Sequence, residues 1–202
     1  MKLGGTDIAR AKISDHISLS ACGLGYMPHL IDSLTVPRIV AEVDEVLSTS
    51  HHVDYDDIPR LEYTTLVLKE TLRRHLVAPG TIRSADREVQ FSGVRIPAGT
   101  TVRLCFLAMH LHPDIYPDPE VFNPENFAER KSDFSSYTFL PFSAGARNCI
   151  GQFMAQFEAK VIVARFFQNF TLRLEPGQTS TVLERLTNFP RDGVMVCVQR
   201  RA

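Results

Sequence analysis

Residues 142–151 are the segment whose residue types and spacing could do chemistry. They read FSAGARNCIG, and the apolar periodicity that begins at Gly151 predicts a long helix directly after Cys149. A helix N-terminus carries partial positive charge and free N–H groups, which we expect to stabilise the thiolate of Cys149. The thiolate is the form of cysteine that binds metal ions, so this segment predicts a metal ligand.

The residues around Cys149 each have a physical task. Gly145 permits a backbone turn with positive φ, and Gly151 lets the chain pass close to a bound group. Arg147 carries a permanent charge that suits the carboxylate of a bound group. Phe142 can pack beside the sulfur and keep water away. Five such positions at set spacing, followed by a helix, favour a metal ligand over an inert buried thiol.

The other three cysteines, Cys22, Cys105 and Cys197, are interpreted as small buried hydrophobic residues. None of them lies in a CxxC pair, so neither a zinc ribbon nor a thioredoxin-type site is indicated. An even number of cysteines would allow two disulfides. Because a chain of this size does not need them and no secretory signal is present, we expect reduced thiols.

The pattern FxxGxRxCxG resembles, without a mismatch, the haem-loop signature of the cytochrome P450 family, and the resemblance covers about residues 36–201. It implies that Cys149 is the axial ligand of the iron of haem b (iron protoporphyrin IX). It also implies that the sulfur pushes electron density onto the metal and favours O–O cleavage. The same resemblance implies haem contacts from Phe142, Gly145, Arg147 and Gly151.

Three features that precede the cysteine loop occur in the same order as in the family. Glu70 and Arg73 form an ExxR motif on one helix face, where they can pair; the family buries this pair, and a solvated surface pair is the alternative. Arg83 matches an arginine that the family places on a haem propionate, and a surface arginine is the alternative. Residues 122–127 resemble the family's PxRF meander with Asn126 at the arginine, which keeps hydrogen bonding but loses the charge and the planar fork. We therefore expect a weaker network there.

The surrounding pattern predicts an α+β fold. By resemblance it is the C-terminal portion of a mostly helical P450-like fold, with a small antiparallel sheet and a loop that carries the cysteine ligand. Residues 1–35 are a divergent, unassigned segment, and 36–202 are the C-terminal part of a P450 domain. Residues 113–127 contain four prolines and predict an irregular meander. The expected helices are 36–47, 61–72 and 151–167, and the expected strands lie within 89–104, at 170–174 and in a terminal hairpin over 183–198 that turns near 191–193.

Composition limits the class of protein. Hydrophobic residues make up 44% of the chain, which is enough for a buried core, and the net charge of −1 gives no indication of nucleic-acid binding. No apolar run approaches the roughly 20 residues that span a bilayer. We expect the chain as written to be soluble or peripheral. The resemblance places a full-length relative in the endoplasmic reticulum membrane through an N-terminal anchor that is absent here.

The distal half of a P450 is not found in the sequence. The family's distal helix carries an acid and a threonine in a pattern such as AGxDT, whereas residues 4–7 read GGTD in the wrong order. Two hypotheses follow. The chain is a monooxygenase, or part of one, that inserts one atom of dioxygen into a hydrophobic substrate. Alternatively, it is a non-catalytic haem-binding or interaction fragment.

The resemblance also implies partners. Electrons would come from NADPH through a reductase that docks on basic residues. Residues 141–178 and 41–47 look most like cholesterol 24-hydroxylase, which suggests a sterol such as cholesterol as the substrate. Segments 77–81 and 188–189 approach the substrate pocket in the family. The candidate docking residues are Lys69, Arg73, Arg74, Arg130, Lys131 and Lys160.

Two groups of histidines have simpler interpretations. His51 and His52 lie near Asp54, Asp56 and Asp57, but no spacing among them fits a zinc site, so a solvated connecting loop is predicted. The segment 110–112, which reads HLH, precedes the meander. We expect hydrogen-bonded packing rather than ligation there.

Overall fold

The computed structural model describes residues 8–13 (backbone), 34–48, 50, 52–128, 137–178, 182–184 and 187–201. Some of the residues discussed above lie outside these ranges, namely Cys22, His51, Arg130, Lys131 and residues 4–7. The helices are α2 (Thr35–Leu47), α3 (Glu62–Arg74), α4 (Phe106–His110) and α5 (Gln152–Asn169), with 3₁₀ turns at Tyr55–Arg60, Pro124–Phe127 and Gly145–Arg147. The strands are β1 (Ile8–Ile13), β2 (Gly80–Ser84), β3 (Val89–Phe91), β4 (Val94–Ile96), β5 (Thr101–Cys105), β6 (Phe170–Leu174), β7 (Val182–Glu184), β8 (Asn188–Pro190) and β9 (Val194–Arg200).

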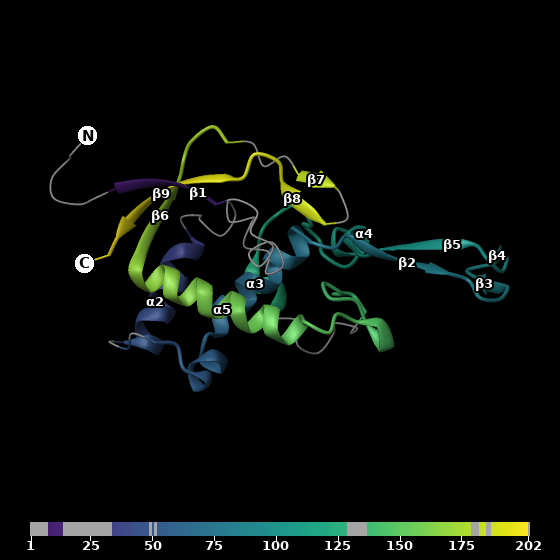
Figure 1. The fold of residues 1–202 in the computed structure, drawn as a ribbon, viewed down its shortest axis with the longest axis horizontal. Helices are drawn as coiled ribbons and strands as arrows, with labels where there is room; N and C mark the ends of the chain where they lie inside the picture. The colour runs from purple at the N-terminus through teal and green to yellow at the C-terminus, as the bar shows by residue number, and fades with distance from the viewer. Residues whose placement is uncertain are drawn as a thin grey trace.

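Three helices build the core. Helices α2, α3 and α5 pack against one another, and α5 crosses the middle of the molecule (Figure 1). On α2 the buried positions Ile39, Val43 and Leu47 recur every four residues, so one stripe of the helix faces inward. Val163 and Phe167 do the same on α5. Each such side chain contributes about 1.5–3 kcal/mol when it is fully buried. The three predicted helices are confirmed.

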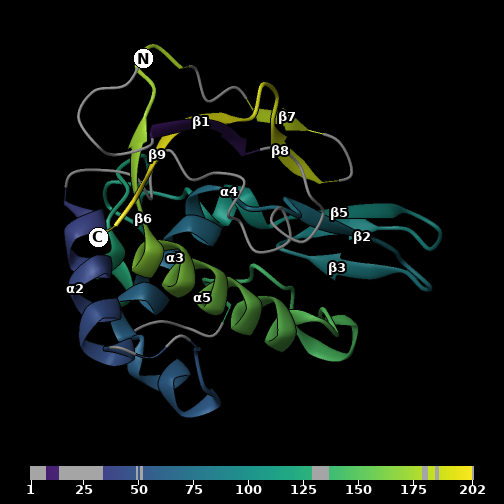
Figure 2. The ribbon, with the colours of Figure 1, turned by 60° about the vertical axis from the view of Figure 1, so that its left-hand side comes forward.

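A three-stranded antiparallel sheet lies beside the helices (Figures 1 and 2). Its strand order is β1–β9–β6, with β9 in the centre. Val194 and Val196 on β9 and Leu172 on β6 are buried and join the helical core, because alternate side chains of a strand point to the same face. Strand β1, which lies within residues 1–35, pairs along one edge of β9.

The predicted terminal hairpin over 183–198 is wrong in its pairing. Strand β7 pairs with β8, and β9 pairs with β6 and β1 instead of with β8. Asn188 accounts for the difference, because its backbone N–H donates to the Val77 carbonyl at 2.7 Å and its buried side chain donates to the Leu76 carbonyl at 3.0 Å. These bonds hold β8 against the segment after α3. The turn at 191–193 then returns the chain to the sheet.

Two pairs of strands, β2–β5 and β3–β4, extend away from the helices, beyond α4 (Figure 1). The pair β3–β4 confirms strands expected within 89–104, and β5 pairs with β2, a strand that is not apparent from the sequence pattern. A Cβ atom at Gly80 would lie 2.2 Å from the Leu104 carbonyl oxygen. The close approach of β2 and β5 therefore requires glycine at this position.

The N-terminus of α3 is capped from another helix. Leu61, the residue before α3, offers no side-chain cap, but the carboxylate of Glu42 on α2 accepts the N–H groups of Tyr63 and Thr64 and the Thr64 hydroxyl. The first backbone N–H groups of a helix have no intrahelical acceptor. Glu42 supplies an acceptor for two of them, and its negative charge interacts favourably with the positive end of the helix dipole.

We predict that Glu42→Ala lowers the free energy of unfolding by about 1–2 kcal/mol, because two N–H groups at the start of α3 lose their acceptor. Urea denaturation followed by circular dichroism measures this change. Glu45→Ala, at an exposed position of the same helix, is the matched control and is expected to stay within about 0.5 kcal/mol of the unmodified chain. Equal losses in both variants would refute the capping role.

Candidate functional site

The loop around Cys149 is held by its own backbone. The Cys149 N–H donates to the Phe142 carbonyl at 2.9 Å and the Asn148 N–H donates to the Gly145 carbonyl at 3.1 Å. Gly145 has φ +76°, as predicted, and Ser143 has φ +65°. Left-handed backbone at a non-glycine residue is uncommon, and it was not predicted at Ser143. The two turns present Cys149, which is exposed, at the rim of the loop.

Helix α5 begins at Gln152, three residues after Cys149, which confirms the predicted helix start. The Gln152 N–H points back to the Cys149 carbonyl at 3.4 Å. A Cβ atom at Gly151 would lie 3.9 Å from the Cys149 sulfur, so glycine keeps that side of the sulfur open. The N-terminal end of α5 therefore lies next to the Cys149 sulfur.

A cavity of about 420 Å³ lies against the loop. Cys149, Arg147, Phe142 and Gly151 all line it, so the structure brings together four of the five predicted loop residues; Gly145 is not among the lining residues. The opposite wall is mostly apolar and includes part of segment 77–81. Its residues are Leu72, Val77, Ala78, Gly80, Thr81 and Phe106.

Arg83 does not line this cavity. It is exposed on β2 and donates to the Thr81 hydroxyl at 2.7 Å and to the Ile82 carbonyl at 2.9 Å. Both acceptors lie within two residues of Arg83 in the strand. The side chain would have to release these bonds before it could bind a carboxylate in the cavity.

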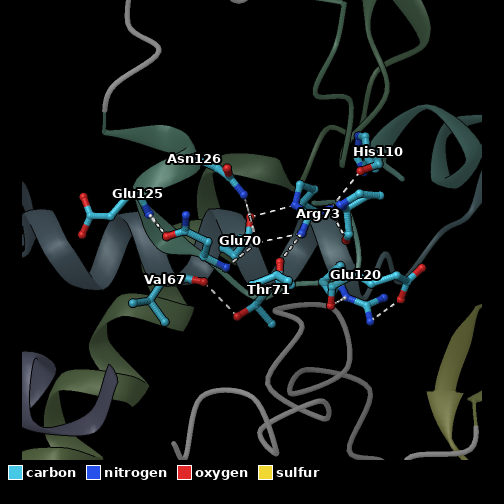
Figure 3. Close-up of polar contacts among 12 residues, drawn as sticks. Val67, Glu70, Thr71, Arg73, His110, Glu120, Glu125 and Asn126 are labelled. Carbon is cyan, nitrogen blue, oxygen red and sulfur yellow. Dashed lines mark hydrogen bonds and ion pairs between the residues drawn. The ribbon is translucent and has the colours of Figure 1, made fainter. Parts of the chain in front are cut away.

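Glu70 and Arg73 form a fully buried ion pair on α3, so the alternative of a solvated surface pair is wrong (Figure 3). The guanidinium donates to both carboxylate oxygens, at 2.8 and 2.7 Å. It also donates to the carbonyls of His110, Pro119 and Val121 at 2.9–3.0 Å. The hydrogen bonds of Arg73 outside α3 therefore go to the end of α4 and to the meander.

Asn126 joins this pair from the meander (Figure 3). Its amide donates to the two carboxylate oxygens of Glu70 at 3.3 and 3.4 Å, and the Asn123 N–H donates to one of them at 2.8 Å. The Asn126 bonds are long, so the backbone N–H of Asn123 is the stronger link. The predicted network between the meander and the Glu70–Arg73 pair is present, with the amide of Asn126 as one of its donors.

The four described basic residues of the predicted docking surface do not lie together. Arg73 is buried, so its assignment to a docking surface is wrong. Arg74 pairs with Glu120. Lys69 and Lys160 instead face a second cavity of about 60 Å³ between α3 and α5, next to Phe139 and behind the cysteine loop. Burial, followed by the charge of Lys69, lowers the pKa of Lys160.

His110 is buried and hydrogen-bonded, as predicted for packing. Its Nε2 accepts the Leu140 N–H at 2.9 Å, and its ring stacks on Phe139 with the ring centroids 5.3 Å apart. Burial and the nearby charge of Arg73 lower its pKa to about 4, so the ring is neutral at pH 7. Sequence reasoning missed that His110 contacts the segment leading into the cysteine loop, because a lone histidine carries no signal of its partner.

The acidic segment near His52 is a solvated turn, as predicted. Asp57 accepts the Asp54 N–H and pairs with Arg60. Within the described ranges, no group of three or more His, Cys, Asp or Glu side chains could hold a metal ion. Among the same residues, no helix is long and apolar enough to cross a bilayer.

We predict that Arg73→Leu lowers the free energy of unfolding by about 3–5 kcal/mol, because it leaves the Glu70 carboxylate buried without its counter-ion. Urea denaturation followed by circular dichroism provides the measurement. The neighbouring Arg74→Leu removes only the partly exposed pair with Glu120 and should cost less than about 1 kcal/mol. Similar losses in the two variants would contradict the role assigned to the buried pair.

The comparisons with known proteins agree with one another. Residues 33–198 match the sequence profile described as Cytochrome P450. The chain is 38% identical to Cytochrome P450 4A10 of Rattus norvegicus over 164 residues, which are 81% of this chain and 32% of the relative. It is 38% identical to Cytochrome P450 3A9 of the same organism over 137 residues, 67% of this chain and 27% of the relative.

A solved structure, retinoic acid bound cyanobacterial CYP120A1, has a TM-score of 0.84 and 28% identity to the chain. The match covers 91% of this chain and 42% of that one. The chain thus spans about a third of the length of the curated relatives described above. These relatives belong to the 4A and 3A groups, and they give no support to the predicted likeness to cholesterol 24-hydroxylase.

Proposed function

Because the chain belongs to the cytochrome P450 family, we propose that it is the haem-binding part of a haem-thiolate monooxygenase with Cys149 as the axial ligand of the iron. One observation carries the proposal. The exposed sulfur of Cys149 lies at the start of α5 and lines a cavity of about 420 Å³ together with Arg147. A thiolate next to a cation and a helix N-terminus, against an apolar wall, suits a planar dianionic macrocycle.

The residues of the loop fit haem b in their chemistry. The Cys149 thiolate would bind the iron, and the Arg147 guanidinium would bind a propionate. Phe142 would shield the sulfur from water, while Gly145 and Gly151 would hold the loop in its turn and keep the sulfur accessible. Arg83 is a second candidate for a propionate once it leaves Thr81.

Bound haem would supply the activation of dioxygen and the insertion of one oxygen atom into a substrate, with electrons from NADPH delivered by a reductase. The chain's own residues would bind and orient the reactants. Leu72, Val77, Ala78 and Phe106 line the cavity and favour a hydrophobic small molecule. The relative solved with retinoic acid bound is consistent with an apolar substrate, and no feature of this cavity selects a sterol.

A second function, that of a non-catalytic haem-binding or interaction fragment, is favoured by the surface next to Cys149. Ile150 is fully exposed, and Phe153 and Met154 are 78% and 75% exposed on the first turn of α5. Contiguous exposed apolar residues of this size mark an interface. Since oxygen chemistry needs a pocket closed to water, we propose that turnover requires additional polypeptide over this surface, whereas haem binding requires only the loop.

We predict that residues 1–202, loaded with haem, reduced and exposed to carbon monoxide, give a thiolate-type Soret band that Cys149→Ala abolishes. The reason is that alanine offers the iron no sulfur. Cys105→Ala, which removes the other exposed described cysteine, is the control and should keep the band. Identical spectra from the unmodified chain and Cys149→Ala would refute ligation. A normal band without substrate turnover would support the fragment function.

A reductase partner would dock near Lys69 and Lys160. Both side chains face the small cavity behind the cysteine loop, and the described residues supply Lys69 with no ion pair. An acidic partner would relieve the repulsion between these two cations and would dock close to the thiolate. This docking surface is defined here by Lys69, Lys160, Phe139 and Gln156.

We predict that the double variant Lys69→Glu/Lys160→Glu weakens reductase binding by about tenfold, or about 1.4 kcal/mol, and reduces its dependence on salt. Surface plasmon resonance at two ionic strengths measures both effects. Arg173→Glu, at an exposed position on β6, is the matched charge reversal and should leave binding unchanged. Docking elsewhere would be indicated by equal affinities for the double variant and the unmodified chain.

A further inference from the structure

His110 connects two parts of the molecule that are distant in sequence. It is the last residue of α4 and is fully buried. Its backbone carbonyl accepts a hydrogen bond from Arg73 at 3.0 Å, and its ring nitrogen Nε2 accepts the Leu140 N–H at 2.9 Å. One residue therefore contacts the buried ion pair through its backbone and the segment before the cysteine loop through its ring.

The contacts continue from Leu140 to the cysteine. The Leu140 carbonyl accepts the Ser143 N–H at 3.2 Å, which closes the turn in which Ser143 has φ +65°. Two residues after Leu140, the Phe142 carbonyl accepts the Cys149 N–H at 2.9 Å. A hydrogen bond that positions Leu140 therefore also positions the carbonyls of Leu140 and Phe142, which accept the hydrogen bonds that hold the cysteine loop.

We propose that His110 is a positioning residue for Cys149, because its ring holds the backbone of Leu140 and so sets the place of the cysteine loop relative to α3. The inference rests on the proposed function of Cys149 as the iron ligand. His110 does not touch the cavity, so it acts through the loop. No other described side chain accepts a hydrogen bond from the Leu140 N–H.

The chemistry of the ring suits this task. A neutral imidazole can accept a hydrogen bond at one nitrogen only when that nitrogen carries no proton, so the proton lies on Nδ1. The lowered pKa keeps the ring in this form at neutral pH. The ring of Phe139, one residue before Leu140, stacks on the imidazole that presents Nε2 to the N–H.

Two substitutions separate positioning from simple packing. Gln can place its side-chain oxygen near the position of Nε2 and accept the Leu140 N–H, whereas Phe keeps a stacked ring but has no acceptor. Positioning predicts that His110→Gln resembles the unmodified chain and His110→Phe does not. Packing alone predicts that His110→Phe resembles the unmodified chain and that His110→Gln does not. His112→Gln, at an exposed histidine two residues away, is the control.

The experiment uses the full chain and three readouts. Without haem, hydrogen exchange of the Leu140 amide and the rate of maleimide addition to Cys149 are followed by mass spectrometry. With haem, the share of the thiolate-type band is recorded with carbon monoxide. In His110→Phe we expect Leu140 exchange to be at least about tenfold faster, Cys149 alkylation to change and the thiolate share to fall; in His110→Gln all three should remain near those of the unmodified chain.

The inference is overturned if His110→Phe keeps the Leu140 protection and the thiolate band, or if His110→Gln loses them equally. If His110→Phe does not fold, hydrogen exchange in the unmodified chain still tests the inference. A Leu140 amide that exchanges at the rate of an unstructured peptide would exclude its hydrogen bond to His110. Failure of the proposed function is distinct. It would appear as identical spectra for the unmodified chain and Cys149→Ala, whatever the exchange at Leu140.

Discussion

Taking Glu70 and Arg73 out of water costs several kcal/mol for each ion before their attraction is counted. The pair is stable at this depth only because its other hydrogen-bonding groups are satisfied. Arg73 donates to three backbone carbonyls in addition to Glu70, and Glu70 accepts from the Asn123 backbone as well. The requirement to satisfy these groups draws residues 110–126 onto one face of α3, and the geometry of the site follows from it.

The consequence extends to Cys149 through the backbone. Residues 110–126 carry His110, and the His110 ring holds Leu140, so a helix motif 76 residues before the cysteine orients the loop that presents it. Helix α5 constrains the loop from the other side, because it begins three residues after Cys149 and packs against α2 and α3. The sulfur is thus placed by two rigid supports and a short loop between them.

The sequence predicted what depends on local pattern. The helices, the turn at Gly145 and the position of Cys149 before α5 follow from periodicity and spacing within a few residues. It did not predict what depends on distant partners. The pairing of β9 with β6, the hydrogen bonds from Arg73 to the carbonyls of residues 110–121 and the hydrogen bond from Leu140 to His110 each join segments between 20 and 50 residues apart, and a single sequence carries no record of such contacts. The Arg83 side chain shows the same limit, since its neighbours on β2 decide where it lies.

The asparagine at position 126 departs from the arginine that the family pattern leads one to expect, and the charges around it explain why the network persists. Glu70 and Arg73 together are neutral. A second guanidinium at position 126 would add hydrogen bonds but would also place an unbalanced positive charge beside a buried pair, at a cost in desolvation. The Asn126 amide adds no charge, reaches both carboxylate oxygens at 3.3 and 3.4 Å, and leaves the stronger link to the Asn123 backbone. The meander therefore stays attached to α3 mainly through the bond from the Asn123 backbone to Glu70. Any residue at position 126 would leave this bond in place as long as the turn at 124–127 forms.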